Sequence, residues 1–137
     1  MDNSTKKLSH IILYVNKNVS EEDISSFCTN VRSENPYIGF TYLCYDNQFS
    51  RDENDISANL TEALSEDADS LFIITDSGKA IEYATERNIA CAALNSQNRE
   101  DARFKKVLYC IEDIGFMTYF TINRMWQRHH GIPCLER

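Results

Sequence analysis

The segment from Leu71 to Leu94 limits the possible folds of this chain more than any other. It opens with the short apolar run Leu71–Thr75 and closes with a second one, Ile89–Leu94. Such runs, without alternation of polar residues, are typical of strands buried on both faces of a parallel sheet. Between them Ala80, Ile81 and Ala84 follow a helical spacing, and Asn88 suits a left-handed helix end. The segment therefore predicts a strand, a helix and a second, parallel strand.

The same alternation extends through the whole chain. We expect strands at 8–15, 38–45, 71–75, 89–94 and 107–111. We expect helices from Ser20 to the Asn35-Pro36 stop, over about 56–64, after Asp76-Ser77, and over about 115–130 as a closing helix. This order predicts an α/β fold: a doubly wound, mainly parallel sheet of about five strands with helices on both faces, a HAD-like or Rossmann-like three-layer sandwich. Residues 1–137 suffice for one such domain.

The composition of the chain argues against some classes of partner and bears on its location in the cell. The net charge of −7 makes nucleic acid an unlikely partner, and the acid-rich stretch 46–69 is expected to be a solvated face. No apolar run reaches the roughly 18 residues that cross a membrane, and the first residues lack a signal-peptide core. We therefore expect a cytoplasmic protein without membrane partners.

The five cysteines are odd in number and widely spaced, without a Cys-x-x-Cys pair. This pattern argues against a disulfide framework and a structural zinc site. We expect four of them to be small buried hydrophobic residues: Cys28, Cys44, Cys91 and Cys110.

In parallel sheets, ligands bind at the carboxyl ends of the strands. The residues expected at that edge, which we call the ligand face, are Asn16, Lys17, Asn18, Asp46, Thr75, Asp76, Ser77 and Lys79. Asp76, the following helix N-terminus and Lys79 could together hold a cation or a phosphate. Alternatively, Asp76 or Ser77 only caps the helix. The stretch Thr75–Lys79 lacks the first glycine and the hydroxyl residue of a phosphate-binding P-loop.

The closing helix carries an apolar face and two adjacent histidines. Its packing face is expected to comprise Phe116, Tyr119, Ile122, Met125 and Trp126. Neighbouring residues on a helix point about 100° apart, so His129 and His130 are expected to be cap or surface residues rather than metal ligands. His10, inside a strand, is expected to be a hydrogen-bonded interior or edge residue.

The first strand and the Asp76 segment together resemble the core of the haloacid dehalogenase-like (HAD) superfamily, which consists mostly of Mg-dependent phosphatases. In that family an apolar strand is followed by Asp-x-Asp, whose acids are nucleophile and general acid/base. Here the matching residues are Asn16 and Asn18. An amide neither attacks phosphorus nor donates a carboxylic proton. The segment Ile73-Ile-Thr-Asp76-Ser77 resembles the family's acidic motif before a helix, so that Asp76 is the acid retained and a weak candidate for a metal ligand.

A second resemblance involves the end of the chain. Val107-Leu-Tyr-Cys-Ile-Glu-Asp113 and Asn123-Arg-Met-Trp-Gln-Arg-His-His-Gly-Ile-Pro133, with the Ile-Thr-Asp-Ser segment, look like the small N-terminal domain that precedes some GNAT-type N-acetyltransferase domains. This resemblance implies an acetyltransferase domain as a partner. The chain lacks the acetyl-CoA-binding pattern of those enzymes, so we do not expect acetyl transfer here.

Together these patterns favour a non-catalytic HAD-like domain that senses a ligand, such as a small phosphorylated molecule, or mediates an interaction. No cofactor is required by this hypothesis, although Mg²⁺ is compatible with it. Two alternatives stay open at the sequence level. One is an active Mg-dependent hydrolase that uses Asp46 and Asp76 on one cation. The other is a receiver-like or flavodoxin-like binding domain.

Overall fold

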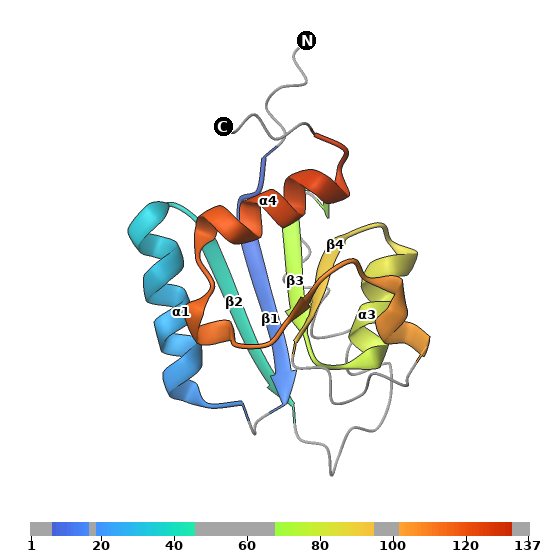
Figure 1. Cartoon of the computed structure of the whole chain (residues 1–137), viewed down its shortest axis with the longest axis horizontal. Helices are drawn as coiled ribbons and strands as arrows, with labels where there is room; N and C mark the ends of the chain where they lie inside the picture. The colour runs from blue at the N-terminus through green and yellow to red at the C-terminus, as the bar shows by residue number, and fades with distance from the viewer. Residues whose placement is uncertain (1–6, 17–18, 46–67, 95–101, 133–137) are drawn as a thin grey trace.

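Five parallel strands form one sheet in the order β2-β1-β3-β4-β5 (Figure 1). The computed structural model describes residues 7–16, 19–45, 68–94 and 102–132. The strands are β1 (His10–Asn16), β2 (Gly39–Tyr45), β3 (Leu71–Thr75), β4 (Ala90–Leu94) and β5 (Cys110–Ile111). The predicted parallel α/β fold is therefore confirmed.

Among the described residues, three α-helices and three short 3-10 helices surround the sheet. The α-helices are α1 (Glu21–Glu34), α3 (Gly78–Glu86) and α4 (Tyr119–His129), and the 3-10 helices are η3 (Ala68–Ser70), η4 (Ala102–Lys106) and η5 (Ile114–Phe116). Each α-helix begins after a residue whose side-chain oxygen accepts a hydrogen bond from the first turn: Ser20, Ser77 and Thr118. No helix in the described part of the chain combines the length and apolar character that crossing a membrane requires.

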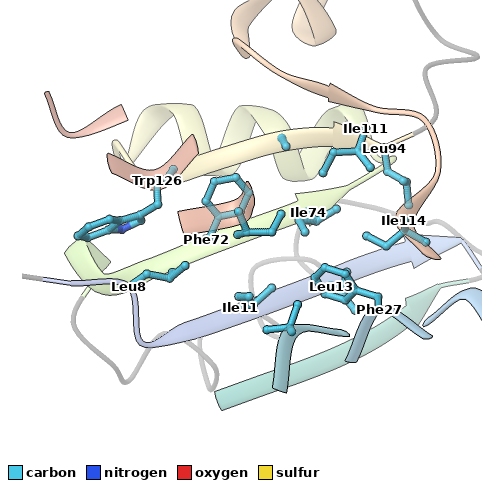
Figure 2. Packing of buried hydrophobic residues seen from close by; sticks show 14 of the residues in the cluster. Leu8, Ile11, Leu13, Phe27, Phe72, Ile74, Leu94, Ile111, Ile114 and Trp126 are labelled. Carbon is cyan, nitrogen blue, oxygen red and sulfur yellow. The ribbon is translucent and has the colours of Figure 1, made fainter. Parts of the chain in front are cut away.

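The two faces of the sheet have separate cores, as expected for a sheet wound on both sides. On one face, α1 and α4 cover Ile11, Leu13, Phe72 and Ile74, with Trp126 at one end of the cluster (Figure 2). On the other face, Ala80 and Ala84 of α3 pack against the alternate residues of β1 and β3. Because β1 and β3 are buried on both faces, Ile11–Val15 and Leu71–Ile74 form apolar runs without polar alternation.

Two predicted details of the chain are confirmed. Asn88 has a φ of 56°, and this left-handed conformation ends the α3 segment before β4. The His10 side chain hydrogen-bonds the neighbouring strand, its Nε2 lying 2.7 Å from Thr41 Oγ1. The predicted helix over 56–64 lies outside the described residues.

Four expectations at the end of the chain and at the cysteines were wrong. The predicted strand 107–111 pairs only through Cys110 and Ile111, and Leu108 is exposed. The closing helix begins at Tyr119 rather than near residue 115. Because η5 and the extended Met117 precede that helix, Phe116 is out of phase with its packing face and is 81% exposed. Cys44 and Cys110 are exposed because their strands lie at the sheet edges among the described elements.

Candidate ligand site at the carboxyl edge of the sheet

The direction of winding reverses between β1 and β3. From β1 the chain crosses through α1 to β2, on one side, whereas from β3 it crosses through α3 to β4, on the other side. Helices α1 and α3 consequently cover opposite faces (Figure 1). In sheets of this kind the reversal leaves a crevice at the carboxyl ends of the two strands, where ligands bind. This crevice is the place to test the predicted ligand face.

A carboxylate joins the two strands at this crevice. The backbone N–H of Asn16 donates to Asp76, with N···O distances of 3.1 Å to Oδ1 and 3.4 Å to Oδ2. The pairing of β1 with β3 ends at Tyr14 and Thr75, so the Asp76 side chain continues the bonding beyond the last backbone pair. Asn16 is only 7% exposed, and a buried N–H without a partner is costly. Asp76 therefore stabilises the fold at this position.

The helix cap is Ser77 and not Asp76. The N–H of Ala80 donates to Ser77 Oγ at 3.2 Å, which satisfies one free group of the first turn of α3. The N–H of Ser77 in turn donates to the hydroxyl of Thr75, 3.0 Å away, and Thr75 is fully buried. Of the two candidates for the cap, only Ser77 has this role, which leaves Asp76 to reach across to β1.

Sequence reasoning missed a cation beside the start of α3. Gly78 is the first residue of this helix, and a Cβ placed there would lie 2.9 Å from the guanidinium of Arg103. Arg103 belongs to η4, and its Nη1 lies 3.7 Å from Glu82 Oε1. Positive charge at a helix N-terminus opposes the helix dipole, and the Glu82 carboxylate offsets part of this cost. The glycine at position 78 indicates that another group packs closely against the helix start, but the sequence does not identify that group as Arg103.

The described members of the predicted ligand face lie at one edge of the sheet. Asn16 ends β1, Thr75 ends β3, and Asp76, Ser77 and Lys79 occupy the turn and first helical residues that follow. Asn16 and Thr75 are buried, while the other three are partly exposed. Lys17, Asn18 and Asp46 lie outside the described residues. Within the described ranges, no three His, Cys, Asp or Glu side chains are grouped so as to hold a metal ion.

The two histidines at the end of α4 lie beside the core rather than at this crevice. His129 Nε2 donates to the carbonyl oxygen of Asn88, 3.3 Å away. The ring of His130 lies 4.7 Å from that of Trp126, measured between centroids, and His130 caps the helix. Their positions agree with the cap role predicted from the sequence.

Comparison with known proteins found no family model, no curated protein and no solved structure that matches this chain. The HAD-like and acetyltransferase-linked relationships therefore stay predictions from the sequence.

Proposed function

We propose that this chain is a non-catalytic HAD-like domain that senses a ligand or mediates an interaction through the crevice between β1 and β3. The observation that carries the proposal is the bond from the Asn16 backbone to Asp76. In a HAD enzyme both positions would supply acids to the reaction. Here one position is an amide, and the carboxylate at the other accepts a backbone hydrogen bond of the fold.

The chemistry at this edge favours an anionic ligand, such as a small phosphorylated molecule. Lys79 lies in the first turn of α3, and the Arg103 guanidinium lies beside Gly78 at the same helix end. Backbone N–H groups at a helix N-terminus, together with nearby cations, attract phosphate. Such a ligand needs no cofactor, and Mg²⁺ is compatible with it as a counterion.

A phosphatase assay with Mg²⁺ tests the non-catalytic role. We expect p-nitrophenyl phosphate to be hydrolysed no faster by the wild-type protein than by the buffer. Turnover that is lost in Asp76→Ala but kept in Glu86→Gln would overturn the proposal in favour of a Mg-dependent hydrolase. Glu86 is a suitable control because it is an exposed acid near the other end of α3.

An accessory role beside an acetyltransferase is the form of this proposal that the second resemblance supports. It predicts a GNAT-type domain either encoded beyond Arg137 in the same reading frame or bound by this domain in solution. Sequencing of the reading frame, followed by co-purification with any neighbouring acetyltransferase, tests it. Absence of such a domain from both would contradict the accessory role while leaving the ligand-sensing role intact.

The strand order favours one alternative, a receiver-like or flavodoxin-like binding domain. The order 2-1-3-4-5 is the one found in flavodoxin-like folds, which bind their ligand at the switch between β1 and β3. Asp76 directly follows the central strand β3, where a phosphoryl-accepting domain needs its aspartate. Incubation with acetyl phosphate tests this alternative, because it predicts a phosphoryl group on Asp76 by mass spectrometry. A flavin-binding domain would instead be yellow as purified.

A further inference from the structure

The opposite edge of the sheet contains a cavity of about 240 Å³. It lies between the end of α3, the segment that leads into β5, and the last turns of α4. Its lining residues are Phe72, Thr85, Asn88, Ile89, Cys91, Lys106, Val107, Leu108, Tyr109, Met125 and His129. None of them belongs to the crevice between β1 and β3, so the cavity is a separate site.

Apolar and polar side chains both line this cavity. Phe72 belongs to the core that α1 and α4 cover, and Met125 of α4 packs against that core, whereas Ile89 belongs to the core on the α3 face. Desolvation raises the pKa of the Cys91 thiol to about 12, so the thiol stays protonated at neutral pH. A protonated thiol behaves as a small apolar group with a weak donor. The apolar part of the lining can therefore take the apolar body of a ligand.

Three of the polar residues at the cavity are bonded or cationic. The hydroxyl of Thr85 donates to the carbonyl of Ile81 at 2.7 Å, and His129 Nε2 donates to the carbonyl of Asn88. Lys106 contributes a full positive charge. No Asp or Glu is among the described residues that line the cavity, although the chain has a net charge of −7. A local excess of positive charge in an acidic protein favours an anionic ligand.

We propose that this cavity binds a small carboxylate with an apolar body the size of one aromatic ring. An apolar cavity of about 150 Å³ is known to hold benzene, so the larger volume here has room for a ring with a short acidic arm. The apolar body would contact Val107, Leu108 and Met125, three lining residues whose apolar side chains stay at least partly exposed. The carboxylate would pair with the Lys106 ammonium at the protein surface, with His129 held nearby by its bond to Asn88.

A titration with phenylacetate tests the proposal, monitored by amide chemical shifts in two-dimensional NMR. We expect saturable shifts at the lining residues Thr85, Asn88, Ile89, Cys91 and 106–109, and smaller ones at 75–79. Phenylacetamide has the same body without charge and should bind about tenfold more weakly, because it loses the charge-assisted contact. Acetate, which lacks the body, and phenethylamine, which carries the opposite charge, should cause no saturable shifts.

Two variants distinguish binding of phenylacetate in the cavity from a general attraction of the anion to the positively charged surface. Lys106→Gln should weaken phenylacetate binding about fivefold to tenfold, as loss of a charged partner predicts. Lys105→Gln removes the same charge from the neighbouring exposed residue, which does not line the cavity, and should leave binding unchanged. Amide dispersion in the same spectra verifies that each variant is folded.

Three results would overturn the proposal. They are equal binding of phenylacetate and phenylacetamide, equal losses in the two lysine variants, and no saturable shift at the lining residues up to solubility. The proposed function at the other edge is independent of these results, because its own tests concern Asp76.

Discussion

The two edges of the sheet differ in how their side chains are arranged. At the carboxyl edge, polar groups of the crevice bond to one another: Asp76 to the Asn16 backbone, Ser77 to Ala80, and the Ser77 backbone to Thr75. At the opposite edge, where the strands begin and which is called the amino edge, side chains of α3, β3, β4, η4 and α4 line a cavity, with a lysine and a histidine among them. An acid at the site predicted from the sequence can therefore already serve as a hydrogen-bond acceptor within the fold. Space for a ligand can meanwhile lie where no sequence motif points.

The largest effect is expected at the amino edge, from Trp126→Ala. The Trp126 side chain is 1% exposed, and its Nε1 donates to the carbonyl of Asp69 at 3.0 Å, which anchors α4 to the residues before β3. Removal of a buried tryptophan typically costs about 3–5 kcal/mol of unfolding free energy. Urea denaturation measures this loss. Trp126→Phe keeps most of the apolar contact and should lose less than half as much.

A smaller loss of unfolding free energy in Trp126→Ala than in Asp76→Ala would contradict this difference between the two edges. In that case the polar contacts at the carboxyl edge would contribute more to stability than the apolar packing at the amino edge.

The second effect concerns the carboxyl edge. Asp76→Ala removes the carboxylate that accepts from the buried N–H of Asn16, and such a loss costs about 1–3 kcal/mol. Asp76→Asn keeps an acceptor oxygen and should cost less. Hydrogen exchange supplies a local measurement, since the Asn16 amide should exchange faster in Asp76→Ala while amides of α4 change little. Unchanged exchange at Asn16 would contradict the structural role of Asp76.

A third, smaller effect separates the cap from the carboxylate. Ser77→Ala removes the cap of α3 and should cost about 1 kcal/mol, the usual value for an N-cap serine. Ser77→Asp restores an acceptor and should recover most of that loss. If Ser77→Ala were neutral and Asp76→Ala alone destabilised α3, the assignment of the cap would be reversed.

The smallest effect is expected at the amino edge, in the pH dependence of stability that arises from Cys91. Because the folded-state pKa of Cys91 is about 12, above the ordinary thiol value of 9.0, the unfolded chain loses this proton first. The contribution of Cys91 to stability is therefore complete below pH 9 and falls as pH rises toward 12. The stability difference between wild type and Cys91→Ala, followed over that range, measures it.

Alkylation provides a second measurement on the same thiol. At pH 8, exposed Cys44 and Cys110 should react with iodoacetamide well before Cys91. Equal rates for all three thiols would mean that the cavity does not desolvate Cys91.

The first four strands and the boundaries of α1 and α3 were predictable because local signals decide them. The apolar run Leu71–Thr75 is β3 residue for residue, and Asn88 adopts the expected left-handed conformation. The segment Val107–Tyr109 has the residues of a strand, but its register brings only Cys110 and Ile111 opposite β4. Strand propensity does not specify how much of a neighbouring strand is available for pairing.

The candidate site was predictable in location but not in its contacts. The sequence placed Asp76 at the end of a strand and Asn16 at the end of another, and parallel topology brought them to one edge. Whether Asp76 or Ser77 caps α3 depends on a bond to a residue far along the chain, which no local pattern encodes. The same holds for Arg103 beside Gly78, because η4 and α3 are joined through β4 and the residues after it.

The bond between Asn16 and Asp76 also has a consequence for the order of folding. The two residues are 60 positions apart, so their contact requires closure of a long stretch of chain. Such closure has an entropic cost that must be met before the contact forms, which makes distant parallel pairings slow. We therefore expect the bond to form after the folding barrier has been crossed. Asp76→Ala should then accelerate unfolding and leave the refolding rate nearly unchanged.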